Sequence, residues 1–140
     1  MNQEKKRFET IEHTADVGIV VYGRTPEELY ENAAYGMFSL ISDTSDIKEI
    51  FRISVSIDAH DREELLITFL NELLYYYSTK KIFFKRFEIL TLSETHLDAN
   101  VSGAEISGHE ILRDIKSATY HGIRIDKSVP GYKVKIIFDV

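Results

Sequence analysis

The spacing of apolar and polar residues predicts strands in two parts of the chain. Residues 16–22 are rich in β-branched and aromatic side chains and are followed by Gly23, a pattern that favours a strand closed by a turn. Residues 50–57 carry apolar side chains at alternate positions, which is typical of a strand with one buried face. We therefore expect Asp16 to lie at the entry of a strand.

Two further stretches repeat their apolar residues with the period of an α-helix. In the first, Thr25 is a suitable cap, Pro26 suits the first helical position and Glu28 completes a capping box. A second helix opens with the same logic at residues 61–64 and is expected to end near Ser78. The predicted buried positions are Leu29, Ala33, Met37, Leu40 and Ile41 in the first helix, and Leu65, Leu66, Phe69, Leu70, Leu73, Leu74 and Tyr77 in the second.

The rest of the chain is predicted to be short strands and loops. Residues 83–92 and 96–102 resemble the arms of a hairpin, and the segments 116–120, 122–126 and 132–140 read as short strands, whereas 43–49 is a loop and 103–114 is ambiguous. We therefore predict an α+β fold, a two-layer sandwich with two main helices packed on a mixed, largely antiparallel sheet.

Composition narrows the class of protein. At 140 residues and 44% hydrophobic content, the chain is expected to form a single domain over 1–140. It has no cysteine, which excludes disulfide scaffolds, thiolate zinc sites and thiol nucleophiles. There is no apolar run of membrane-spanning length and the start is charged, so we expect a cytoplasmic protein without a membrane partner.

The net charge of the chain indicates which kind of binding partner to expect. The formal net charge of −6 at pH 7 opposes tight, sequence-independent binding to nucleic acid, because phosphate groups are neutralised by clustered Lys and Arg. We therefore expect nucleic acid to be engaged only indirectly, through a protein partner.

Acidic residues near the two ends of the chain are the sharpest candidate site. If the strand entered at Asp16 pairs with the last strand, Asp16, Asp139 and the terminal carboxylate of Val140 come together. Closely spaced carboxylates repel one another unless a cation neutralises them, and hard cations such as Ca²⁺ favour oxygen ligands. The alternative interpretation is that these are solvated acids at strand ends, where Asp is common in turns.

Three other polar residues have weaker signals. His13 is a candidate ligand, proton donor or hydrogen-bonding partner of its own loop, and the last role is favoured. Glu72 lies among leucines, where a carboxylate must reach solvent, a partner or a cation, and Lys116 is suited to a phosphate or a partner's acid. Alone, Glu72 and Lys116 also fit ordinary surface positions.

An enzyme remains the competing class at this point. A metal-dependent hydrolase or phosphotransferase would use the same carboxylates, with His13 as acid or base. No nucleophile and base with a supporting motif accompanies these acids in the sequence, which disfavours this interpretation.

Four separated motifs give the chain a family resemblance. Residues 12–18, 70–75, 115–121 and 138–140 together resemble the archease family in order and spacing. The resemblance implies a compact α+β fold related to small strand-helix-strand-strand domains. It also implies a non-catalytic activator of the RtcB-type RNA ligase of tRNA splicing, which promotes guanylylation and multiple turnover of the ligase and broadens its use of nucleoside triphosphates. The alternative function is that of a chaperone-like partner of a tRNA methyltransferase.

The resemblance also implies roles for individual residues. The family binds a divalent cation, typically Ca²⁺, and the matching ligand positions are Asp16, Asp139 and Val140. Glu72 and Lys116 match positions associated with activation of the ligase, and His13 lies in the first shared motif. Where family members often have Ala, this chain has Ser117, a difference of little consequence.

Overall fold

The structure, a computed structural model, describes residues 6–12, 16–106, 108–128 and 130–140. Two helices and eight strands follow one another in the order β1 (Phe8–Glu12), β2 (Asp16–Gly23), α1 (Pro26–Ile41), β3 (Phe51–Asp58), α2 (Arg62–Lys80), β4 (Ile82–Leu92), β5 (His96–Glu105), β6 (Ser117–Ala118), β7 (Ile125–Ser128) and β8 (Gly131–Asp139). Within these ranges no helix is long and apolar enough to cross a membrane.

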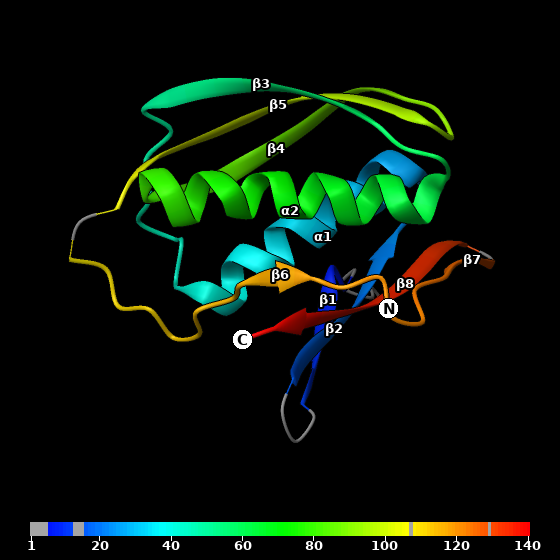
Figure 1. The fold of residues 1–140 in the computed structure, drawn as a ribbon, viewed down its shortest axis with the longest axis horizontal. Coiled ribbons are helices and arrows are strands. Elements are labelled where there is room, and N and C mark those ends of the chain that lie inside the picture. The colour runs from blue at the N-terminus through cyan, green and yellow to red at the C-terminus, as the bar shows by residue number, and fades with distance from the viewer. Residues whose placement is uncertain (1–5, 13–15, 107, 129) are drawn as a thin grey trace, which may run out of the picture.

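The described strands form two antiparallel sheets. One has the order β1-β2-β8-β6 with β7 also paired to β8, and the other has the order β3-β5-β4. The two helices lie between the sheets (Figure 1). The predicted α+β class is confirmed, but its strands divide between two sheets instead of forming one. The reason is that α1 buries residues all round its axis, so it needs apolar surface on more than one side.

Both helices begin where the capping residues predict. The Thr25 hydroxyl accepts a hydrogen bond from the Glu28 amide at 3.1 Å, and the Asp61 carboxylate accepts one from the Glu64 amide at 2.8 Å. Each glutamate also reaches back, Glu28 to the amide of Arg24 and Glu64 to that of the residue before Asp61. These bonds satisfy amides that have no partner inside a helix.

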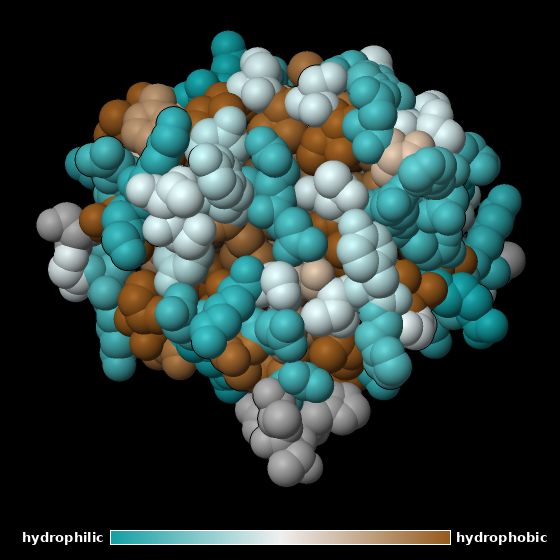
Figure 2. Space-filling view, in the orientation of Figure 1, coloured by the Kyte–Doolittle hydropathy of each residue, from teal (hydrophilic) through white to brown (hydrophobic). Residues whose placement is uncertain are grey.

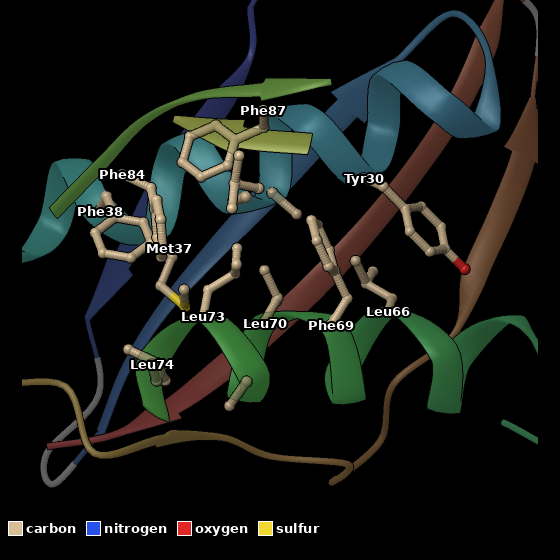
Figure 3. Packing of buried hydrophobic residues seen from close by; sticks show 14 of the residues in the cluster. Tyr30, Met37, Phe38, Leu66, Phe69, Leu70, Leu73, Leu74, Phe84 and Phe87 are labelled. Carbon is tan, nitrogen blue, oxygen red and sulfur yellow. The ribbon is translucent and has the colours of Figure 1, made fainter. Parts of the chain in front are cut away.

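The helices pack on each other and on β4 through large side chains. In Figure 3, Leu66, Phe69, Leu70 and Leu73 of α2 point into the space occupied by Met37, Phe38, Phe84 and Phe87. The Phe38 ring lies 5.8 Å from the Phe84 ring and 5.9 Å from the Phe87 ring, measured between centroids. All the positions predicted as buried on the two helices are buried.

One strand has no counterpart in the sequence analysis. Strand β1 pairs with β2, with Phe8 opposite Val21. Phe8 packs edge-on against Tyr35 with 6.2 Å between ring centroids, and it covers Gly36, where a Cβ would lie 3.0 Å from the Phe8 ring. Within residues 8–12 only Phe8 and Ile11 are apolar, so the segment lacks the i, i+2 alternation of a half-buried strand and gives a weaker signal than the turn and helix patterns that follow it.

Strands β3 and β5 are joined on their outer face by an ionisable cluster. His96 lies opposite Asp58 in the register. Its ring nitrogens lie 2.7 Å from an Asp58 oxygen and 3.0 Å from an Asp98 oxygen. Hydrogen bonds to Asp58, and then to Asp98, raise the pKa of His96 above its ordinary value, because a ring with two carboxylate partners donates from both nitrogens only as the cation.

We predict that this cluster makes stability depend on pH. A raised folded-state pKa means that the stabilisation is complete below the ordinary pKa of 6.5 and is lost as the pH rises through the folded value. The difference in urea midpoint between the natural protein and His96→Gln should therefore be larger at pH 5.5 than at pH 8.5. His121→Gln, at an exposed position, is the control, and an equal difference at both pH values would contradict the assignment.

Candidate functional site

Pairing of β2 with β8 brings Asp16 opposite Asp139. The register runs without a bulge from Gly23 opposite Tyr132 to this pair. Residues directly opposite in an antiparallel pair have Cβ atoms about 4.5–5.5 Å apart and lie on the same face. The register confirms the strand pairing on which the sequence-based expectation depends, and it places these two aspartates side by side on adjacent strands.

A close approach beside the aspartates depends on a glycine. Gly18 lies opposite Ile137, and a Cβ at Gly18 would be 2.9 Å from the Ile137 Cδ1 atom and 3.1 Å from a main-chain oxygen of β8. Real Cβ contacts are rarely this short. A larger residue would therefore require the Ile137 side chain to move and the main chain of β8 to shift by a few tenths of an ångström.

Strand β6 adds a second neighbour on the other side of β8. Ser117 lies opposite Asp139, and the Lys116 amide donates to the Asp139 main-chain oxygen at 2.8 Å. The Ser117 hydroxyl also donates to the Asp139 carboxylate at 3.4 Å. Asp139 therefore lies between Asp16 and Ser117, with its main chain held on the side of β6.

Helix α2 holds the segment that contains β6. The Asn71 side chain accepts from the Ala118 amide at 2.8 Å and donates to the Ala118 oxygen at 3.1 Å. Thr68 contacts the Tyr120 hydroxyl at 3.2 Å. The hydroxyl of Tyr77, further along the helix, donates to Asp114 at 3.0 Å. Residues 114–120 thus run antiparallel to α2, and we call this set of contacts the α2 clasp.

Two further candidate residues lie next to residues of the clasp in the sequence. Glu72 directly follows Asn71 and is partly exposed, and Lys116 is exposed between Asp114 and Ala118. Val140 follows Asp139 and is 45% exposed. His13, the remaining candidate, lies outside the described residues.

Asn71 is the site residue that the sequence analysis missed. Its amide pairs with both main-chain groups of Ala118, as a neighbouring strand would. The signal was an amide within an otherwise apolar stretch of α2, next to the more conspicuous Glu72.

Burial and the Asp114 bond raise the pKa of Tyr77 to about 12, so this hydroxyl keeps its proton and remains the donor.

The chemistry of the donors fits a hard cation better than zinc. The structure places Asp16 opposite Asp139, and Val140 directly follows Asp139. Carboxylate and main-chain oxygens, which these residues carry, are the ligand type that Ca²⁺ prefers. In the part of the chain that the structure describes, no group of three or more His, Asp or Glu side chains is arranged to hold a metal. A cation here would therefore need main-chain oxygens and water in addition to the two aspartates.

The fold and site define a class of small α+β proteins with an acidic strand end exposed beside a helix. Residues 8–140 match the family model described as the archease protein family (MTH1598/TM1083). The chain belongs to the archease family, as the sequence motifs predicted.

Known proteins show how far this similarity extends. The chain is 32% identical to the protein archease of Methanosarcina mazei over 100% of both chains, and 37% identical to that of Saccharolobus islandicus over 96% of this chain and 99% of the relative. The solution structure of protein 1598 of Methanobacterium thermoautotrophicum has a TM-score of 0.83 and 36% identity, covering 96% of this chain and 99% of that one.

A more distant structure shares the fold. The crystal structure of a Thermotoga maritima archease, described as a possible chaperone, has a TM-score of 0.67 and 22% identity, and it covers 100% of this chain and 99% of its own.

We predict that Asn71→Ala loosens the α2 clasp. The substitution leaves both main-chain groups of Ala118 without their partner, a loss that costs about 1–3 kcal/mol for buried groups. Urea unfolding should show this loss, and hydrogen exchange at the Ala118 amide should accelerate. Asn100→Ala is the matched control because the Asn100 side chain accepts a hydrogen bond from the Ser54 hydroxyl, between β3 and β5 and away from the clasp. Unchanged exchange at Ala118 would contradict the role given to Asn71.

Proposed function

We propose that this protein is a non-catalytic activator of the RtcB-type RNA ligase of tRNA splicing. In this role it promotes guanylylation and multiple turnover of the ligase and broadens the range of nucleoside triphosphates that the ligase accepts. Membership of the archease family supports the proposal. The observation that carries it is the facing pair Asp16 and Asp139 at an exposed strand end, beside the α2 clasp with Glu72 and Lys116.

We propose that the paired aspartates bind a divalent cation, most readily Ca²⁺. The ligands would be the carboxylates of Asp16 and Asp139 and main-chain oxygens of Val140. When bound, the cation supplies positive charge that offsets the repulsion between the carboxylates. The protein's own contribution is the β2–β8 register and the bonds from β6, which hold the two carboxylates in place.

Two mechanisms are compatible with this site. In the first, the acidic end enters the nucleotide pocket of the ligase and helps to position metal ions and the triphosphate, because phosphoryl transfer depends mainly on positioning and charge neutralisation. In the second, it binds the open ligase preferentially and shifts the conformational equilibrium. Under both, Glu72 and Lys116 contact the partner.

Exposed aromatic side chains beside the site suit a protein partner. Tyr75 is 58% exposed and Tyr120 is 52% exposed, and Tyr75 lies two helical turns from Thr68, the residue that contacts Tyr120. Tyrosines are enriched in the parts of protein interfaces that carry binding energy. On the face of the molecule that carries α2 and β6, hydrophobic residues lie in separate places among hydrophilic ones (Figure 2), as in a transient interface.

A chaperone-like function is the second candidate. The Thermotoga relative is described as a possible chaperone, and a tRNA methyltransferase would be the client. Affinity purification of the tagged protein from its own cytoplasm, where we propose that it acts, separates the two. Recovery of the ligase supports activation, and recovery of the methyltransferase without the ligase supports the chaperone function.

We predict that Asp16→Asn and Asp139→Asn each strongly reduce activation while leaving the fold intact, because each removes one charge from an exposed strand end. The measurement is multiple-turnover RNA ligation by the cognate ligase with GTP and metal and substoichiometric amounts of each variant. Asp126→Asn, on β7 of the same sheet, is the control and should activate fully. Full activation by both site variants would refute the assignment, and calorimetric titration with Ca²⁺ would separately test cation binding.

For Lys116 we predict a different pattern. Lys116→Ala should slow guanylylation of the ligase several-fold and leave Ca²⁺ affinity unchanged, because the ammonium group contacts the partner and not the cation. Lys81→Ala, at the exposed end of α2, provides the control. Equal guanylylation rates for Lys116→Ala and the control would remove Lys116 from the interface.

A further inference from the structure

A pocket of about 830 Å³ lies at the other end of the β2–β8 pair. Tyr22, Gly23 and Gly131 contribute to its wall, together with the residues that precede α1. At about 3.3 Å per residue along β2, this end lies some seven residues, roughly 20 Å, from the aspartates. The pocket is therefore separate from the candidate cation site.

The charged groups of this pocket leave an excess of positive charge. Lys6, whose ammonium group is paired with Glu9, lines it together with Arg7, Arg24 and Lys133, and so do two glutamates. Both glutamates already accept main-chain amides, Glu28 from Arg24 at 2.6 Å and Glu31 from Ile89 at 2.9 Å. Within the described residues, Arg24 and Lys133 form no ion pair. In a chain of net charge −6, such a local excess favours an anionic ligand.

Arg7 is held in place by a buried residue. Its Nε donates to the Asn32 side-chain oxygen at 2.9 Å, and its guanidinium lies 3.6 Å from the centre of the Tyr35 ring. Asn32 is only 7% exposed and is itself fixed by a bond from its amide nitrogen to the Tyr22 oxygen at 2.7 Å. The hydrogen bond to Asn32 occupies one edge of the guanidinium group, and the Tyr35 ring covers one of its faces. The terminal nitrogens bond no described residue, and a preorganised guanidinium suits paired hydrogen bonds to phosphate.

The volume of the pocket and its lining residues indicate which class of anion it would bind. Its volume falls in the range of about 300–1,000 Å³ that is usual for small-molecule and cofactor sites, much larger than inorganic phosphate needs. Tyr22 and Tyr132 are among its lining residues, and tyrosine side chains are surfaces on which a nucleotide base stacks. Gly131 keeps part of the wall free of side chains, because a Cβ there would lie 2.2 Å from the Gly23 oxygen.

We propose that this pocket binds a nucleotide, with Arg7 contacting its phosphate and Arg24 and Lys133 adding positive charge. The nucleotide is either free or the end of an RNA strand, since both present the same phosphate and base. This site goes beyond the activator function, because it does not use the aspartates and its occupancy is measured without the ligase.

Binding of defined probes to the full chain tests the proposal. We would titrate the protein with GTP, with a short oligoribonucleotide bearing a terminal phosphate, and with tripolyphosphate, using calorimetry at low salt. We expect saturable binding of GTP, the oligonucleotide or both, with at least ten-fold weaker binding in Arg7→Ala. Arg24→Ala and Lys133→Ala, which remove no side-chain hydrogen bond or ion pair to a described residue, should each weaken binding several-fold. Lys135→Ala, on β8 outside the pocket, should bind as the natural protein does.

Three results would overturn the proposal. The first is no saturable binding of either nucleotide probe at millimolar concentration. The second is unchanged affinity for the nucleotide probes in both Arg24→Ala and Lys133→Ala. These two variants keep the test valid even if Arg7→Ala disturbs the fold. The third is tripolyphosphate binding as tightly as GTP, because the tyrosines would then contribute nothing. If the protein did not activate the ligase in ligation assays, the interpretation of these binding results would not change.

Discussion

The pairing of β2 with β8 is the constraint on which the rest of the structure depends. It joins a segment near the start of the chain to the last segment over eight residue pairs. Its inner face buries Ile19 and Val21 from one strand and Val134, Ile136 and Phe138 from the other, and α1 packs against that face. Because the inner face is apolar, a slip of either strand by one residue would turn the buried side chains of that strand toward solvent, so the core itself enforces the register that sets Asp16 opposite Asp139.

The α2 clasp extends this constraint to the rest of the site. Segment 114–120 has only a two-residue strand of its own, too short to be stable as an isolated pairing. Its position is fixed by bonds to β8 together with side chains of α2, and α2 is fixed by the core that it shares with α1 and β4. The outcome is that residues from distant parts of the sequence surround the end of β8 on a rigid support, which is what a positioned site requires.

Local signals in the sequence predicted the helices and most strands, because caps, apolar periodicity and turn residues act over a few positions. The meeting of Asp16 and Asp139 was also predictable, since it needed only one strand pairing. Asn71 and Arg7 were not, because their roles depend on partners 47 and 25 positions away. The division into two sheets escaped prediction for the same reason: the strand pattern records which side is buried but not which strand lies next to it.

The central claim is that Asp16 and Asp139 act as one unit in activating the ligase, and a double-mutant cycle tests it most directly. The rate of ligase guanylylation would be measured with the natural protein, Asp16→Asn, Asp139→Asn and the double variant. If the two carboxylates share one function, the double variant should be no worse than either single variant. Independent, multiplicative losses from the two substitutions would contradict the account.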